Sequence, residues 1–398
     1  MANVSSSNGL EKRPKLRFPG FDEPYRLTQL GDIASLVNRI DPKSNAPIMM
    51  LSAGNGFIMQ SEKYSRDNAG QSLKKYILLK QGELAYNHGA SKAKQFGCCY
   101  ELTEPEARIP YVYHCFKINE HEYTPYIAMT LNNPKMDKQL KRLVSSSVRM
   151  DGLLNISFED YMSVSLHLPS TNEQKRIANF IQKIDERIVA QEKLLASLKK
   201  YKRGLLSNLF GEKAAQKWTT KSYYFSEIAQ RRNKKYDPTS GIEYPCVELD
   251  NIEQETGKIL STVPSTAQSS IKNIAMSGDT LFGKLRPYLR KYAFAQKTMA
   301  CSSEIWALIP SDVVLPKFLF YLVQTEQFLR VANISSGTKM PRAEWSNIEK
   351  AEFFIPDLFV QRKIVFLLER LDQKITFADS ALFCLNRLNA SLLQQLFI

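Results

Sequence analysis

A hydrophobic repeat in residues 177–209 constrains this chain more than any other feature of its sequence. Apolar side chains recur there at alternating intervals of four and three residues over more than four heptads, which is typical of the seam of a coiled coil. The pattern returns 187 residues later, where Pro356 and Gln361 match Pro169 and Gln174. Two copies in register predict a duplicated protein. The predicted seam comprises Ile177, Ile181, Ile184, Ile188, Leu195, Leu198, Leu205 and Leu209, followed by Ile364, Leu368, Leu371, Ile375, Leu382, Leu385, Leu392 and Leu396.

The segments that precede the two helical copies repeat as well. Gly82 and Gly278 each lie in a turn before a short apolar run, and an Asp-Pro turn precedes each of them. Short alternating strands and short helices predict an α/β (α+β) fold for each half, without a defined topology. The predicted organisation is a flexible N-terminal arm at 1–20, a globular domain at 21–168, a central coiled-coil helix at 169–212, a second globular domain at 213–355 and a C-terminal coiled-coil helix at 356–398.

The two long helices are expected to pair with each other. About 38 residues at 1.5 Å each span roughly 57 Å, which is more than one small domain can cover. Equivalence of the two halves then predicts an antiparallel coiled coil about a pseudo-twofold axis. Pairing with another subunit is the alternative. We expect a capping box at Thr171–Gln174 or Ser170–Glu173, an N-cap at Asp357, and a helix-dipole or capping role for Asp185 and Asp372.

Composition favours an acidic partner. The chain has 398 residues and a net charge of +14, from 54 Lys and Arg against 40 Asp and Glu. Nucleic acid is the first expectation, because such a surplus attracts phosphate. No apolar run is long enough to span a membrane, and residues 1–20 lack the apolar core of a secretory signal. Six cysteines without CxxC spacing and four histidines make a structural zinc site unexpected. We therefore expect a cytoplasmic protein with reduced thiols.

The start of the first helix carries a family resemblance. Pro169, then Glu173-Gln174, Ile177-Ala178 and Ile181, resembles the repeated helix of the specificity subunit of type I restriction–modification enzymes. The second copy departs from this pattern with Val360 in place of the glutamate. The resemblance covers nearly the whole chain and implies two target recognition domains that read a bipartite site in double-stranded DNA. It also implies two methyltransferase and two restriction subunits as partners in a bacterial or archaeal cytoplasm. S-adenosylmethionine, ATP and Mg are then expected on those partners, with no cofactor on this chain.

Candidate DNA-binding residues concentrate at 272–297, where basic and aromatic side chains alternate on a predicted turn and strand. That mixture suits phosphate contacts combined with base-edge contacts. A solvated basic face over core aromatics is the competing interpretation. The candidates are Lys284, Arg286, Tyr288, Arg290 and Lys291, with Arg286 as the first choice.

The first domain offers a less basic equivalent. Its candidates are Asn87, Lys92 and Lys94, and the serine-rich loops before the two long helices add Arg149 and Lys339. Such loops are commonly only connections. His114 and His167 lie among apolar residues and are interpreted as packing residues, whereas His121 is expected at the surface.

Recognisable catalytic motifs are missing from the sequence. We find no glycine-rich methyl-donor loop and no phosphate-binding loop, because the Gly-Lys pairs lack the upstream glycine. The sequence therefore favours a non-catalytic DNA-reading subunit. A single-chain nuclease or methyltransferase with an unrecognised site is the alternative, and an RNA-binding coiled-coil arm would not explain the duplication.

Overall fold

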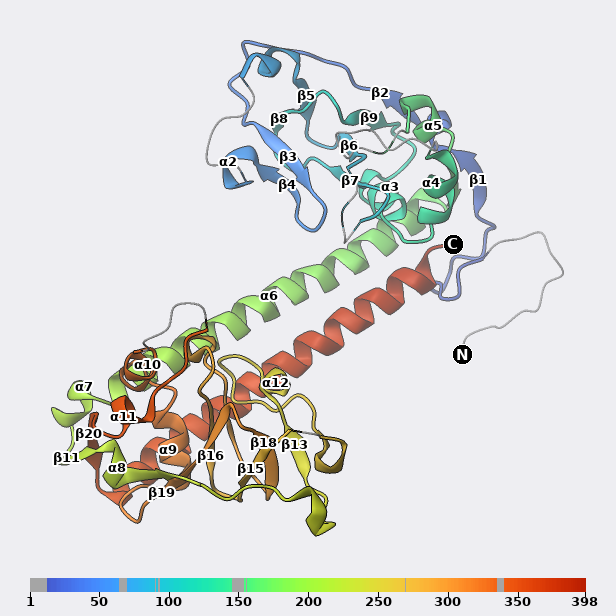
Figure 1. The fold of residues 1–398 in the computed structure, drawn as a ribbon. Coiled ribbons are helices and arrows are strands. Elements are labelled where there is room, and N and C mark those ends of the chain that lie inside the picture. Colours follow the sequence, from blue (N-terminus) through green and yellow to red (C-terminus); the bar gives the residue numbers. More distant parts are fainter. Residues whose placement is uncertain are drawn as a thin grey trace. The chain divides into compact units, whose positions relative to one another are not determined.

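The computed structural model describes residues 13–63, 70–89, 91, 94–144, 154, 156–268, 270–334 and 340–398. It divides into two compact units, Met1–Ala190 with Leu382–Ile398, and Gln191–Ala381. Each unit holds one globular domain and parts of both long helices, α6 (Thr171–Leu209) and α12 (Leu358–Leu396) (Figure 1). No helix in the described ranges is both long and apolar enough to cross a membrane.

The first globular domain is built from small antiparallel sheets. Its main sheet has the order β2-β9-β6-β7, formed by Ala34–Leu36, His114–Ile118, Leu84–Asn87 and Cys98–Glu101. Three two-stranded ribbons join it: β1 (Arg26–Gln29) with β10 (Ser165–Leu168), β3 (Met49–Ser52) with β4 (Gly56–Met59), and β5 (Ile77–Lys80) with β8 (Glu106–Ile109). The helical segments are α1 (Leu30–Ile33), α2 (Gln60–Lys63), η1 (Gly70–Lys75), α3 (Thr124–Leu131), α4 (Asp137–Leu143) and α5 (Phe158–Met162).

The second globular domain repeats this plan. Its main sheet has the order β12-β19-β16-β17, formed by Ala229–Arg231, Ile305–Pro310, Thr280–Gly283 and Tyr292–Phe294. A second sheet has the order β14-β13-β18-β15 (Val263–Pro264, Pro245–Val247, Met299–Ser302, Lys272–Ala275), and β11 (Thr220–Tyr224) pairs with β20 (Glu352–Pro356). The helical segments are α7 (Glu212–Ala215), α8 (Phe225–Ile228), η2 (Pro238–Ser240), η3 (Leu249–Asn251), η4 (Ser265–Ala267), η5 (Pro287–Leu289), α9 (Pro316–Leu322), α10 (Glu326–Ala332) and α11 (Trp345–Ile348).

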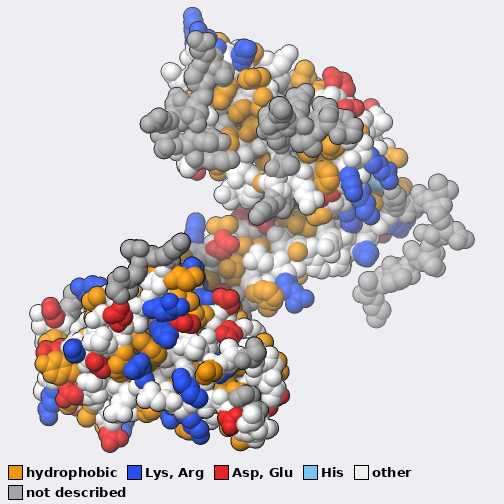
Figure 2. Space-filling view, viewed as in Figure 1, with side chains coloured by type: hydrophobic (Ala, Val, Ile, Leu, Met, Phe, Trp, Pro, Cys, Tyr) orange, Lys and Arg blue, Asp and Glu red, His pale blue; other side chains and the backbone are white. Residues whose placement is uncertain are grey.

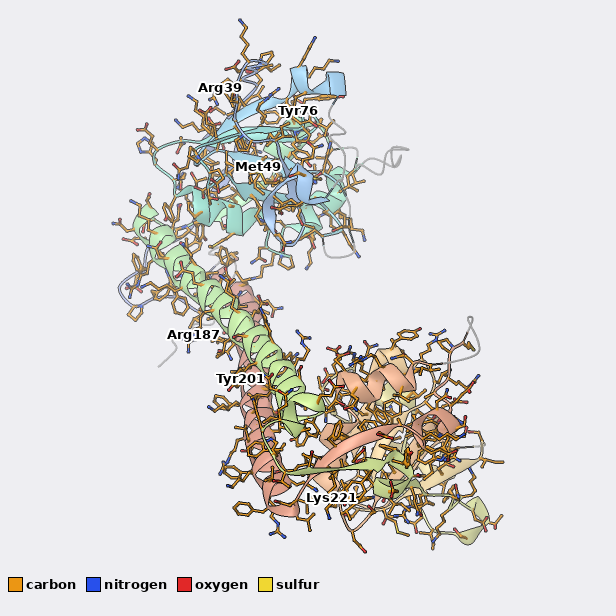
Figure 3. All side chains as sticks on the ribbon, turned by 90° about the vertical axis from the view of Figure 1, so that its left-hand side faces the viewer. Arg39, Met49, Tyr76, Arg187, Tyr201 and Lys221 are labelled. Carbon is orange, nitrogen blue, oxygen red and sulfur yellow. The ribbon has the colours of Figure 1, made fainter. Side chains whose placement is uncertain are left out.

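The expected turns before β6 and β16 are equivalent in detail. Gly82 and Gly278 have φ of 82° and 94°, a conformation that disfavours a side chain. The acidic residue after each glycine is buried and pairs with an arginine from elsewhere in its domain, Arg39 with Glu83 and Arg232 with Asp279. Arg39 is labelled in Figure 3. These matched ion pairs support the duplication that the sequence predicts.

Each domain core is completed by the end of the other repeat's helix. In the first unit, Ile177 and Ile181 of α6 share a core with Leu396 and Phe397, and the Phe397 ring stacks on Tyr126 with centroids 5.2 Å apart. In the second unit, Ile364 and Leu368 at the start of α12 share a core with Leu206 and Phe210 at the end of α6. The start of one helix thus meets the end of the other in both units, which confirms the antiparallel coiled coil.

Three polar side chains, Gln191, Lys202 and Asn389, interrupt the apolar seam. Gln191 donates to the carbonyl of Ala378 at 3.0 Å, between positions that are equivalent in the repeat. Lys202 forms an ion pair with Asp372 at 2.6 Å, and Asn389 donates to Asp185 at 2.7 Å. The two aspartates therefore bridge the paired helices, and the expected helix-dipole or capping role is corrected. Such polar contacts within an apolar seam fix the register of a coiled coil.

The two long helices begin differently from each other. Asp357 caps α12, because its carboxylate accepts from the Val360 N–H at 2.8 Å. At α6 the expected capping box is replaced by contacts with the domain. Gln174 is fully buried, donates to the Pro169 carbonyl and accepts from the Tyr123 N–H.

The second repeat contains the same glutamine contact. Gln361 is fully buried, donates to the carbonyls of Pro356 and Val313 and accepts from the Leu315 N–H. Because Leu315 is the N-cap of α9, this side chain ties the start of the long helix to a short helix of its domain.

Residues 16–18 are packed rather than loose, which corrects the described part of the expected arm. Arg17 forms a bidentate ion pair with the fully buried Glu173, at 2.9 and 2.7 Å. The Leu16 N–H donates to the carbonyl of Gln395, and Phe18 packs edge-on against Phe180. This ion pair uses the glutamate that the second copy replaces with valine. Residues 1–12 lie outside the described ranges.

Candidate nucleic-acid interface

The basic turn, residues 283–291, connects β16 to β17 and carries the main candidates. It closes where the Gly283 N–H donates to the Lys291 carbonyl at 2.8 Å. A Cβ on Gly283 would lie 2.8 Å from the Leu249 side chain and 3.2 Å from the Lys291 carbonyl oxygen, so this close approach favours glycine. Arg286 and Arg290 have φ of 52° and 50°, which is strained for residues with a side chain.

The segment 341–343 holds this turn in place through an isolated antiparallel bridge between Leu285 and Arg342. The Arg286 N–H donates to the Pro341 carbonyl at 2.8 Å, and the Ala343 N–H donates to the Lys284 carbonyl at 2.8 Å. The side chains of Arg286 and Tyr288 remain exposed. Figure 2 shows Lys and Arg side chains interspersed with apolar ones on the visible face of the second domain. A rigid backbone that exposes a guanidinium and a phenol suits recognition of a charged, planar ligand.

Two candidates in the turn have partners within the protein. Arg290 pairs with Glu326 at 2.8 Å and with Glu255 at 3.5 Å. The Lys291 ammonium donates to the Leu249 carbonyl at 2.7 Å. These contacts favour a role in shaping the turn for both side chains. Lys284 is half-buried, and Arg286 and Tyr288 are the most exposed of the five candidates.

A recess of about 250 Å³ lies beside the turn. Its lining comes from the turn and from α10 with the residues after it: Tyr288, Arg290, Glu326, Leu329, Arg330, Asn333 and Ile334. The Arg290–Glu326 ion pair contributes to this lining, whereas Arg330, Asn333 and Ile334 are exposed. Arg330, Asn333 and Ile334 are not among the candidates that the sequence predicts. The one sequence feature that points to these residues is their position directly before the serine-rich loop that carries Lys339.

Two of the first-domain candidates, Asn87 and Lys94, form hydrogen bonds within their own domain. The Asn87 side-chain oxygen accepts from the Gly89 N–H at 2.9 Å, and its amide nitrogen donates to the Leu51 carbonyl at 3.4 Å. The Lys94 ammonium donates to the carbonyl of Asn132, the C-cap of α3, at 2.7 Å. A cation there offsets the negative end of the helix dipole. Lys92, Arg149 and Lys339 lie outside the described residues. A DNA-binding role stays a prediction for all ten candidates.

His114 and His121 lie in the environments that the sequence predicts, a packed one and an exposed one. His114 is partly buried, its Nε2–H donates to the Ile156 carbonyl at 2.9 Å and its ring packs edge-on against Phe158. Burial lowers the pKa of His114 below its usual 6.5. His121 is exposed. Within the described ranges, no group of three or more His, Cys, Asp or Glu side chains could hold a metal ion.

The predicted seam residues are buried or half-buried in every case. The outer faces of the two helices carry exposed side chains, and α6 and α12 differ in which residues they expose. Arg187 and Tyr201, labelled in Figure 3, lie exposed on α6. On α12, Phe359, Phe366 and Phe377 are all more than half exposed. Their spacing of seven and eleven residues places them on one face of the helix. Exposed aromatic side chains along one helix face are typical of interaction surfaces.

Comparison with known proteins finds a family match in the second repeat. Residues 221–380 match the family described as the type I restriction modification DNA specificity domain. The chain is 28% identical over 175 residues to the type I restriction enzyme HindI specificity subunit of Haemophilus influenzae, covering 39% of this chain and 36% of that one. It is 24% identical over 282 residues to the type I restriction enzyme EcoDI specificity subunit of Escherichia coli, covering 60% of this chain and 62% of that one. Both alignments span less than two thirds of the relatives' lengths.

The fold has a counterpart among solved structures. The crystal structure of a type I restriction–modification system S subunit from M. genitalium superposes with a TM-score of 0.60 at 14% identity. That superposition covers 97% of this chain and 99% of the other. It extends the likeness from the second repeat to both repeats and both helices. The second repeat is thus similar in sequence to the DNA specificity domain of type I restriction–modification enzymes, and both repeats with both helices share the fold of a solved S subunit.

Proposed function

We propose that this chain reads a bipartite site in double-stranded DNA and directs the catalytic subunits of a type I restriction–modification assembly, without catalysing a reaction itself. The match of residues 221–380 to a DNA specificity domain, in a chain that repeats its domain and helix, carries the proposal. The net charge of +14 and the exposed Arg286 support a polyanionic ligand. Each globular domain then reads one half-site.

The proposed partners are two methyltransferase and two restriction subunits, in the cytoplasm of a bacterium or archaeon. S-adenosylmethionine, ATP and Mg would be bound by those subunits. The exposed face of α12 with Phe359, Phe366 and Phe377 supports a protein partner on the coiled coil, because burying large aromatic side chains drives association. The antiparallel pairing leaves that face outside the seam.

The test is selection from a random duplex library by the full chain, assembled with its methyltransferase subunit. We expect two short defined sequences separated by an unread spacer of constant length. Exchange of residues 22–165 for another recognition domain should change one of the two sequences and leave the other unaltered. Enrichment of a single continuous sequence, or a change in both half-sites after the exchange, would contradict the proposal.

A further inference from the structure

The recess beside the basic turn places a carboxamide and an apolar side chain next to each other. Asn333 is the C-cap of α10, and its Nδ2 donates to the carbonyl of Leu329 at 2.7 Å. This bond fixes the side-chain torsions while the residue as a whole stays exposed. Ile334 follows directly and is 56% exposed, although it is a large apolar residue. Both line the recess together with Tyr288 of the turn.

The chemistry of this pair matches one kind of base pair. The Asn333 carboxamide keeps its oxygen and its second N–H for a ligand, and adenine offers one donor and one acceptor, N6–H and N7, on its major-groove edge. Thymine, the partner of adenine, carries a methyl group on the same groove edge, which suits contact with an apolar side chain. We propose that Asn333 and Ile334 read an A·T base pair in the half-site bound by the second domain.

The surroundings of Asn333 are preorganised for such a contact. Arg290 joins the basic turn to α10 through Glu326, and Arg290 also pairs with Glu255. Asn333 therefore lies at the end of a helix that is tied to the turn presenting Arg286. A contact built on fixed elements discriminates better than one on a mobile side chain, because less conformational entropy is lost on binding. This assignment rests on the proposed function, since it needs DNA as the ligand.

The experiment compares the full assembled protein with Asn333→Ala and Asn333→Asp. After the wild-type site is selected, affinity is measured for every single base-pair change in the half-site of the second domain. We expect Asn333→Ala to lose preference at one A·T position by about 5- to 150-fold, and to keep the other preferences. Asn333→Asp removes the N–H donors, so the preferred base at that position should change to cytosine, whose N4 amino group donates to a carboxylate.

The control is Asn386→Ala, which removes an exposed asparagine from α12 and should leave every base preference unchanged. Equal loss of affinity for all sequences in Asn333→Ala would overturn the inference, since it would make Asn333 a structural residue or a phosphate contact. An unaltered preference profile would overturn it as well. Failure of the wild-type protein to select any sequence would instead count against the proposed function, so the two failures are distinguishable.

Discussion

Removing a buried glutamine at the start of a long helix should lower the free energy of unfolding. Gln361→Ala should destabilise the second unit by about 1–3 kcal/mol, because the Leu315 N–H and the Val313 carbonyl lose their buried partner. All three tryptophans of the chain lie in this unit, so tryptophan fluorescence during urea unfolding measures its stability. Gln373→Ala, at an exposed position of the same helix, is the control and should be nearly neutral. Equal effects of both changes would show that the buried contacts contribute nothing.

His114 should make the first unit less stable in mild acid. Its pKa in the folded protein is lowered below the unfolded value of 6.5, so the unfolded chain binds more protons between those two pKa values. Stability is therefore fully present above pH 6.5 and is lost as the pH falls through this window, by at most about 1.36 kcal/mol per pH unit for one proton.

The measurement for His114 is the free energy of opening of the β9 amides, obtained by hydrogen exchange between pH 5 and 7 and corrected for intrinsic exchange rates. His114→Gln keeps a hydrogen-bond donor for the Ile156 carbonyl but does not titrate, so its curve should be flatter than that of the wild type. Parallel curves for the two proteins would exclude His114 as the source of the acid sensitivity.

For individual residues, the sequence predicts a basic turn but does not show which of its side chains are exposed and which pair within the protein. Arg286 and Arg290 are both arginines in one short basic segment. Their different environments depend on Glu255 and Glu326, which are distant in sequence and reach Arg290 only after folding. The sequence likewise predicts only a helix-capping role for Gln174, because its contact with Tyr123 depends on tertiary structure.

Among the elements, the polar layers of the coiled coil offer a matched pair of tests. Asp372→Leu should destabilise the second unit by about 1–3 kcal/mol, because it leaves the ammonium of Lys202, a residue that is 7% exposed, without its carboxylate. The double variant with Lys202→Leu should recover part of that loss, since no buried charge remains. Tryptophan fluorescence again reports the unfolding. A double variant no more stable than Asp372→Leu would contradict this account.

The equivalent layer in the first unit provides the comparison. Asp185 faces the neutral Asn389, so Asp185→Leu strands no charge and should cost less than Asp372→Leu. Hydrogen exchange of the α6 amides around Asp185 measures its effect, because the first unit lacks tryptophan. A larger loss at Asp185 than at Asp372 would mean that the charge on Lys202 is not the deciding factor.

The elements differ in how far the sequence could predict them. The two long helices follow from a heptad pattern sustained over their whole length, which is a local property with many repetitions. The order β2-β9-β6-β7 joins strands that are distant in the chain, and strands of three to five residues carry too few alternations to specify their neighbours. The duplication was nevertheless predictable, because the turns at Gly82 and Gly278 and the helix starts recur in the same sequence order.

For the whole molecule, the remaining question is whether the helix pair sets the spacer between the two half-sites. Both helices continue from one unit into the other, and Gln191 contacts Ala378 across the seam close to that boundary. Inserting one heptad after each of these two residues keeps the apolar pattern and leaves the pairing on both sides in register. Insertions at positions that do not face each other would shift the helices past one another and disrupt the domain cores.

The paired insertions lengthen the coiled coil by about 10.5 Å at 1.5 Å per residue, which corresponds to roughly three base pairs at 3.4 Å. Three base pairs turn the duplex by roughly 100°, whereas the supercoil turns by only about 25° over that length. The lengthened protein should therefore prefer a different spacer or lose specific binding, because the second domain would face the wrong groove. Affinity is measured against duplexes that carry both half-sites at every spacer length. Undiminished affinity for the original spacer would show that the helices do not fix the distance, and their exposed faces would then serve only to assemble partner subunits.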